Sequence, residues 1–160
     1  MATAKTYEPK CLNFENWPDH HQAAWMKALQ KVDLFGEGGG GAHWRERSRE
    51  KTRKGYGFWL YWNLCRGIDI SLMPASDIVT QESVLAYVAD LEAINSSMTV
   101  SCRIQELYDA IRVMFPPRRG GEDWRWLRTA MKNLHMNARS SKISEIAYSR
   151  PIRLKNLGWI

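Results

Sequence analysis

The sequence has little of what secreted, membrane-spanning or disulfide-stabilised proteins contain. It has three cysteines, an odd number, and they are widely spaced with no Cys-x-x-Cys pair, so reduced thiols are expected. The longest strongly apolar run, residues 58–65, has eight residues, whereas a helix needs about 20 to span a bilayer. The N-terminus is not followed by the apolar run of a signal peptide. These absences predict a cytoplasmic protein with no membrane partner.

Motifs for catalysis or for binding a metal or cofactor are also missing. The four histidines, 20, 21, 43 and 135, are not spaced with Cys or acidic residues as metal ligands are, so solvated or structural histidines are expected. The glycine-rich stretch 36–41 lacks the preceding strand and the Gly-Lys-Ser/Thr ending of a phosphate loop. The sequence therefore predicts no metal, no cofactor and no small-molecule substrate, and an unrecognised enzyme stays a third alternative.

Acidic residues are scarce in two segments of the chain. The whole sequence has 23 Lys and Arg against 17 Asp and Glu, a net charge of +6. Residues 43–55 carry a net +4 and residues 118–160 a net +7, so the remainder carries −5. An acidic body with two basic segments predicts a polyanionic partner.

Internal repeats and strand-like alternation are absent, and helical periodicity takes their place. Trp17-Pro18-Asp19 is typical of a helix start, which predicts an amphipathic helix of about 15 residues. Further helices are expected over 43–65 with a soft spot at 55–57, over 80–93, from the 95–99 turn to Pro116, and from 123 to 136. The stripes predicted to face inward are Trp25, Ala28, Leu29 and Val32; Val84, Leu85, Val88 and Leu91; Val100, Ile104, Leu107, Ile111 and Met114; Trp124, Leu127, Met131 and Leu134.

These elements predict an all-α fold, a bundle of four main helices with a hinged extra N-terminal helix. Residues 1–36 are expected to form an N-terminal arm, 37–42 a Gly-rich hinge, 43–136 the helical domain and 137–160 an unstructured basic tail. The apolar face of the leading helix is expected to cap its own domain or to dock on a neighbouring molecule.

The basic segment of the second helix is the first candidate binding surface. At about 100° per residue, its bases form two opposite ridges, Arg45, Arg49 and Arg53 on one and Arg47, Lys51 and Lys54 on the other. The second ridge shares its face with Phe58 and Trp62, so the first half of this helix is predicted to project beyond the bundle. A projecting cationic helix suits DNA phosphates. The alternative is a solvated helix whose Glu46 and Glu50 pair with its own bases.

Two further surfaces are candidates. Thr99, Ser101 and Arg103 occupy the first turns of a helix, where free N–H groups favour a phosphate. Helix capping, with Thr99 as the best N-cap, is the alternative for this patch. The third surface is the basic tail, with Arg139, Lys142, Arg150, Arg153 and Lys155.

The order of motifs resembles the N-terminal half of the tyrosine recombinases, or phage integrases. The likeness covers about residues 43–136 and rests on the basic helix running into 56–62, and on segments 84–91, 97–100, 104–111 and 123–127. The resemblance implies a SAM-like core-binding domain that clamps double-stranded DNA in site-specific integration and recombination. It assigns DNA contacts to Arg47, Lys51 and Lys54 and to Thr99, Ser101 and Arg103. It also implies a bacterial or phage-derived, nucleoid-associated protein.

The chain departs from that family in lacking its catalytic residues. The family needs a His-x-x-Arg pair and a nucleophilic Tyr in a C-terminal domain, and here His135 is followed by Arg139 at a different spacing. We therefore expect a DNA-binding fragment that is not an enzyme by itself, with possible self-association on DNA. The alternative function is a helical protein–protein module that uses exposed Trp17, Trp25 or Trp159 and the leading helix.

Overall fold

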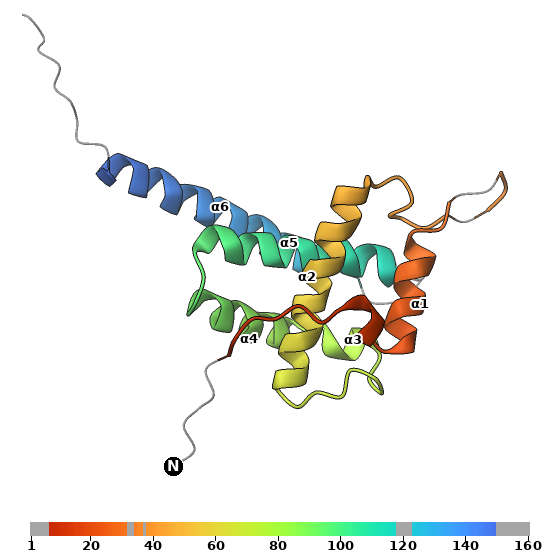
Figure 1. The fold of residues 1–160 in the computed structure, drawn as a ribbon. Helices are drawn as coiled ribbons and strands as arrows, with labels where there is room; N and C mark the ends of the chain where they lie inside the picture. Colours follow the sequence, from red (N-terminus) through yellow and green to blue (C-terminus); the bar gives the residue numbers. More distant parts are fainter. Residues whose placement is uncertain (1–6, 32–33, 37, 118–122, 150–160) are drawn as a thin grey trace, which may run out of the picture.

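The computed structural model describes residues 7–31, 34–36, 38–117 and 123–149, the last six of these by their backbone alone. This part of the chain contains helices and no strand (Figure 1), which confirms the all-α prediction. No helix in it is apolar over a stretch long enough to cross a bilayer. The elements are a 3-10 helix at Phe14–Asn16 and α1 Asp19–Ala28, α2 Glu46–Cys65, α3 Ala75–Ile78, α4 Gln81–Glu92, α5 Ser97–Met114 and α6 Arg125–Ser149.

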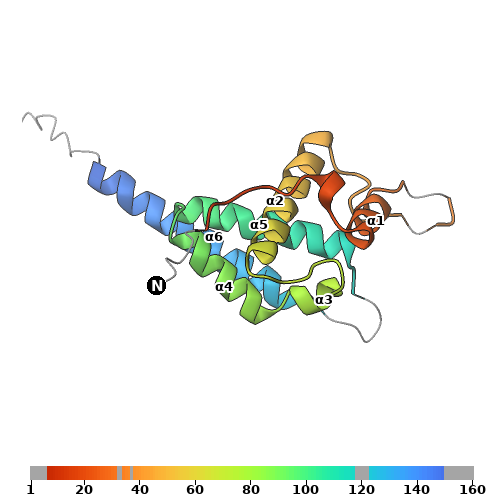
Figure 2. The ribbon, with the colours of Figure 1, turned by 60° about the horizontal axis from the view of Figure 1, so that its bottom comes forward.

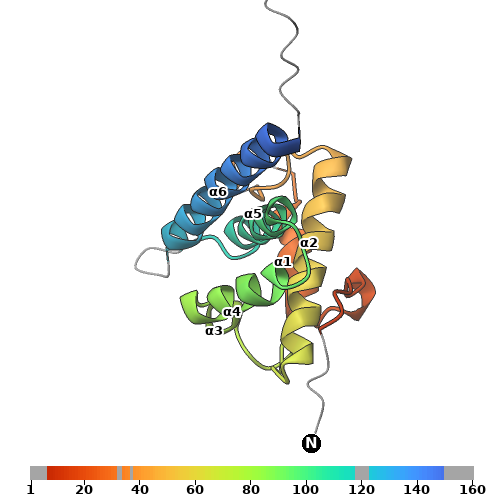
Figure 3. The same cartoon turned by 90° about the vertical axis from the view of Figure 1, so that its left-hand side faces the viewer.

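Helix α5 lies at the centre of the molecule. All five residues of its predicted stripe, from Val100 to Met114, are buried. Helices α1, α2, α4 and α6 all contact α5, and Figure 3 shows α5 nearly end-on between α2 and α6. A helix covered on several sides buries more than one face, so α5 also buries the polar side chains of Ser101 and Glu106.

Helix α2 runs without a break through the predicted soft spot. Trp59, Leu60 and Trp62 are buried, as the apolar second half predicted. Gly55 and Gly57 allow other parts of the chain to pack closely against α2, and they do not interrupt the helix. A Cβ at Gly55 would lie 2.2 Å from the Cβ of Glu106 on α5, and one at Gly57 would lie 2.6 Å from the carbonyl oxygen of Leu12.

Helix α4 begins at a capping box. The Thr80 side chain accepts a hydrogen bond from the backbone N–H of Ser83 at 3.1 Å, and Ser83 Oγ accepts one from the N–H of Thr80 at 2.9 Å. Its inward residues are Val84, Tyr87 and Leu91. The prediction for Leu85 is wrong, since this side chain is 71% exposed and Tyr87 takes the inward position.

The N-terminal helix belongs to the same core as the other helices. Trp25 and Ala28 are buried in that core, and α1 packs on α5. Two glycines of the expected hinge form hydrogen bonds at the C-terminal end of α1. The Gly39 N–H donates to the Gln30 carbonyl at 3.0 Å, and the Gly41 N–H donates to the Ala28 carbonyl at 2.9 Å. The helix is 10 residues long, shorter than predicted, and Val32 lies outside the described residues.

Helix α6 is longer than predicted. It continues to Ser149, so residues 137–149 are helical and the expectation of an unstructured tail is wrong there. Trp124, Leu127 and Ala138 are buried, and Met131 and Leu134 pack against the core half-buried. Figures 1 and 2 both show the C-terminal half of α6 extending beyond the other helices.

Candidate nucleic-acid interface

The N-terminal half of α2 carries exposed basic side chains, as predicted. Arg45, at the N-cap, and Arg47 and Lys51 are exposed, and no described acidic side chain forms an ion pair with any of the three. Glu46 in the first turn favours the helix start by interacting with its dipole. Figures 1 and 3 show this end of α2 extending past α5.

The other bases of this segment are partly engaged within the protein. Arg49 is half-buried and fixes the turn before α2, because its Nε donates to the Trp44 carbonyl at 3.0 Å and its Nη2 donates to the Ala42 carbonyl at 2.8 Å. Lys54 is exposed and pairs with Glu50 at 2.9 Å. Lys54 holds the pKa of the Glu50 carboxyl below its usual value. Arg53 is half-buried, so the second ridge is more accessible than the first.

The patch predicted at the start of α5 is not assembled as a binding surface. Ser96, and not Thr99, is the N-cap, since Ser96 Oγ accepts from the Thr99 N–H at 3.3 Å. Ser101 is 2% exposed. The Arg103 guanidinium lies 4.2 Å from the ring centre of Phe58 and donates to Glu106 Oε2 at 2.9 Å. Ser101 and Arg103 are therefore engaged in the packing of α5.

Glu106 is the acidic residue that sequence reasoning missed. It is 5% exposed between α2 and α5, and burial raises the pKa of its carboxyl against the opposing effect of Arg103. The absent side chain at Gly55 leaves room for Glu106. Gly55 therefore allows α2 to lie close to α5 at the point where Glu106 is buried.

Helix α6 is the second basic element. Arg139 and Lys142 are exposed as predicted, but on a helix and not on a tail. Arg150, Arg153 and Lys155 lie outside the described residues. Sequence reasoning missed three exposed bases on the same helix, Arg125, Arg128 and Lys132. Their spacing of three and four residues, continued to Arg139 and Lys142, is the signal that identifies them.

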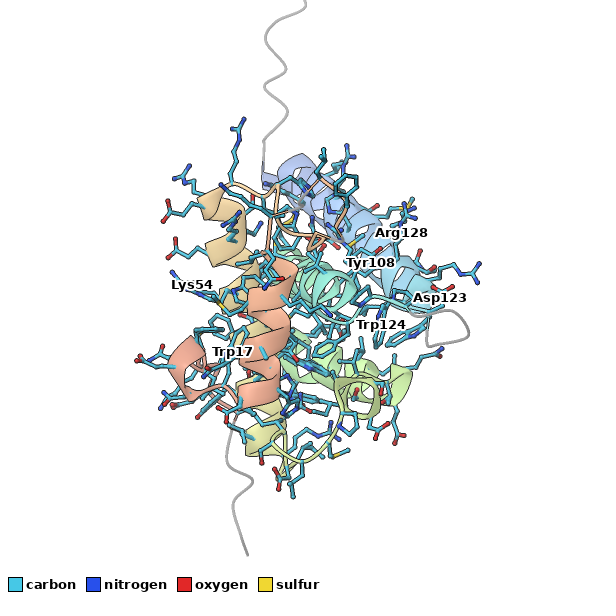
Figure 4. All side chains as sticks on the ribbon, turned by 90° about the vertical axis from the view of Figure 1, so that its right-hand side faces the viewer. Trp17, Lys54, Tyr108, Asp123, Trp124 and Arg128 are labelled. Atoms are coloured by element: carbon cyan, nitrogen blue, oxygen red, sulfur yellow. The ribbon has the colours of Figure 1, made fainter. Side chains whose placement is uncertain are left out.

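The basic half of α2 and helix α6 lie on different sides of α5. In Figures 1 and 3 the N-terminal half of α2 and the C-terminal half of α6 lie above α5, and α3 and α4 lie below it. Figure 4 shows Lys54 of α2 and Arg128 of α6 on opposite sides of the view.

The hollows on the remaining surface do not include the basic side chains of α2 and α6. One hollow of about 960 Å³ is lined by parts of α1, α3 and the end of α5, and another of about 650 Å³ lies beside Tyr61 and Cys65. Neither includes a base of the α2 or α6 segments. Within the described ranges no group of three or more His, Cys, Asp or Glu side chains is placed to hold a metal ion.

The tryptophans expected to anchor a protein partner are in the core. Trp17 and Trp25 are each 3% exposed, and Trp17 contacts both Trp25 and Tyr56 edge-on. The prediction that they are exposed is wrong, because α1 folds onto the bundle. Trp159 lies outside the described residues.

Comparisons of the chain with models of known families, with curated proteins and with solved structures gave no match. The resemblance to tyrosine recombinases therefore rests on the sequence motifs alone. The charge and geometry of α2 and α6 are the structural features that bear on function.

Proposed function

We propose that the chain binds double-stranded DNA, mainly through its phosphates, as the core-binding domain of a tyrosine recombinase. The observation that carries the DNA-binding part is the row of exposed bases Arg47 and Lys51 on one face of α2, together with Arg45 at the N-cap. None of the three has a described acidic partner. The recombinase part rests on the motif resemblance.

The position of this row supports binding over mere solvation. A solvated helix is expected to pair its bases with its own acids, and α2 does this at Glu50 and Lys54. Arg47 stays unpaired although Glu50 lies three residues away, and Lys51 has no acidic residue three or four positions away to pair with. They lie in the N-terminal half of α2, the end of the helix that extends past α5 (Figure 3).

Charge reversal on α2 tests this proposal. The double variant Arg47→Glu and Lys51→Glu should weaken binding to a labelled duplex by at least about tenfold at 0.1 M salt, because two phosphate contacts become repulsive. Fluorescence anisotropy measures the affinity. Far-UV circular dichroism should show unchanged helicity, because both side chains are exposed and neither forms an ion pair with a described acidic side chain. Lys54 is left intact because it pairs with Glu50.

The matched control is Lys27→Glu with Lys31→Glu. This variant changes the net charge by the same amount at two exposed positions on and just after α1. It should lose much less affinity than the α2 variant. Equal losses in the two variants would mean that binding depends on net charge and not on α2, and an unaffected α2 variant would refute the assignment of this face.

A further inference from the structure

Helix α6 carries six basic-type side chains in one line, called here the α6 stripe: Arg125, Arg128, Lys132, His135, Arg139 and Lys142. Successive members are separated alternately by three and four residues. At about 100° per residue they fall within an arc of about 100° on the helix. At 1.5 Å per residue the line is about 25 Å long.

The α6 stripe lies beside the face that packs into the core and is not part of it. Leu127 and Ala138 are buried, and Met131 and Leu134 are half-buried. All six members of the stripe are exposed. Their side chains are therefore available to a partner and are not required by the packing of α6 on α5.

The charge of the stripe is poorly compensated within the protein. Arg125 pairs with Asp123, but no Asp or Glu occurs from residue 125 to 142. Like charges three or four residues apart slightly destabilise a helix, so the fold gains nothing from this arrangement. In α2, by contrast, Glu46 and Glu50 alternate with the bases. An unbalanced row of this kind points to an external polyanion.

The surroundings of the stripe favour a duplex as that polyanion. Proteins that bind single strands stack the bases on aromatic side chains. The aromatic side chain among residues 125–143, Trp126, is half-buried and packs against the core. A straight row about 25 Å long follows an extended backbone better than it encloses a compact anion.

We propose that the α6 stripe binds one phosphate backbone of duplex DNA independently of base sequence, as a second contact surface besides α2. This inference rests on the proposed DNA-binding function. It adds a surface that the motif resemblance does not assign, since the resemblance assigns contacts to the bases of α2 and to the start of α5. Because α2 and α6 pack on different sides of α5 (Figure 3), the two surfaces contribute separate phosphate contacts.

The test compares three variants of the full chain. The α6 variant combines Arg128→Gln, Lys132→Gln and Arg139→Gln, the α2 variant combines Arg47→Gln and Lys51→Gln, and the control combines Lys10→Gln, Lys27→Gln and Lys31→Gln. Binding to two duplexes of unrelated sequence is measured at several salt concentrations. Glutamine keeps helix propensity, and thermal unfolding followed by circular dichroism shows whether each variant is folded.

The α6 variant should bind both duplexes between about ten- and about a hundredfold more weakly at 0.1 M salt, with a salt slope smaller by about 2.7. Its unfolding midpoint should not fall, and the control should lose little affinity. If only the α2 variant binds the duplexes more weakly, the assignment to the α6 stripe is wrong and the proposed function is supported. If only the α6 variant binds more weakly, the α6 stripe is supported as a DNA contact and the assignment to α2 is wrong. Wild-type binding to phosphatidylserine vesicles without binding to duplex would overturn both.

Discussion

His21 shows how a polar side chain is accommodated in the apolar core. It is fully buried, with Nε2 3.0 Å from the carbonyl oxygen of Ile70 and Nδ1 2.7 Å from the Tyr56 hydroxyl. A carbonyl oxygen accepts only, so Nε2 carries the proton and donates, and Nδ1 accepts from Tyr56. Burial, together with a smaller effect of the nearby His20, lowers the pKa of His21 from 6.5 to about 4.

The shifted pKa of His21 predicts acid sensitivity. Because the folded-state pKa is below the unfolded-state value, the unfolded chain binds the proton more readily between pH 6.5 and about 4. The contribution of His21 to stability is complete above pH 6.5 and is lost as the pH falls through that window, by about 2 to 3 kcal/mol. Urea unfolding at a series of pH values measures this loss.

Two variants isolate the effect of His21. His21→Asn removes the titrating group and should flatten this part of the pH profile, although it lowers stability at pH 7. His20→Asn removes the neighbouring exposed histidine and should largely keep the slope. If both variants kept the wild-type slope, the acid sensitivity would come from other groups.

At the residue scale, the sequence predicted the role of His21 correctly but did not predict which residues of α5 are exposed. Because His21 is not spaced with Cys or acidic residues as metal ligands are, a structural or solvated histidine is the expectation from the sequence. Ser101 and Arg103 were predicted as surface residues because the pattern of α5 was interpreted as one buried face. Contacts with four other helices bury further faces, and these contacts are set by tertiary packing and not by the periodicity of α5.

At the scale of elements, the crossing of α2 and α5 depends on a glycine. In a freely exposed helix, Gly→Ala stabilises by about 1 kcal/mol. Gly55→Ala should instead destabilise by about 1 to 3 kcal/mol, because the added Cβ would lie 2.2 Å from that of Glu106. Urea denaturation measures the change in the free energy of unfolding.

Ser48→Ala is the matched control for Gly55→Ala. Ser48 is exposed on the same helix, so its replacement should be neutral or slightly stabilising. A Gly55→Ala protein as stable as the wild type would show that α2 and α5 do not approach this closely.

The sequence predicted the helices well where their apolar periodicity was strong. The second half of α2 and the stripe of α5 are buried as expected. The prediction failed for residues 137–149, where periodicity is weak. A helix already nucleated and packed over its first turns is extended at little cost, and this cooperativity is not visible in a local pattern.

At the scale of the whole molecule, the charges are segregated. Residues 66–96, which include α3 and α4, contain five acidic residues and one basic residue. In Figures 1 and 4 this region lies below α5, and the basic half of α2 and the C-terminal half of α6 lie above it. Such an asymmetry orients the molecule toward a polyanion as it approaches. The sequence showed the two basic segments, and the fold places the described part of each on a different side of α5.

The central claim, that this chain binds duplex DNA through its phosphates, is tested most directly by the salt dependence of binding. A labelled duplex is titrated with the wild-type chain at salt concentrations between about 50 and 200 mM. If about six phosphates are neutralised, the logarithm of the binding constant should fall against the logarithm of the salt concentration with a slope near −5. A slope near zero, or no binding at the lowest salt concentration, would contradict the account.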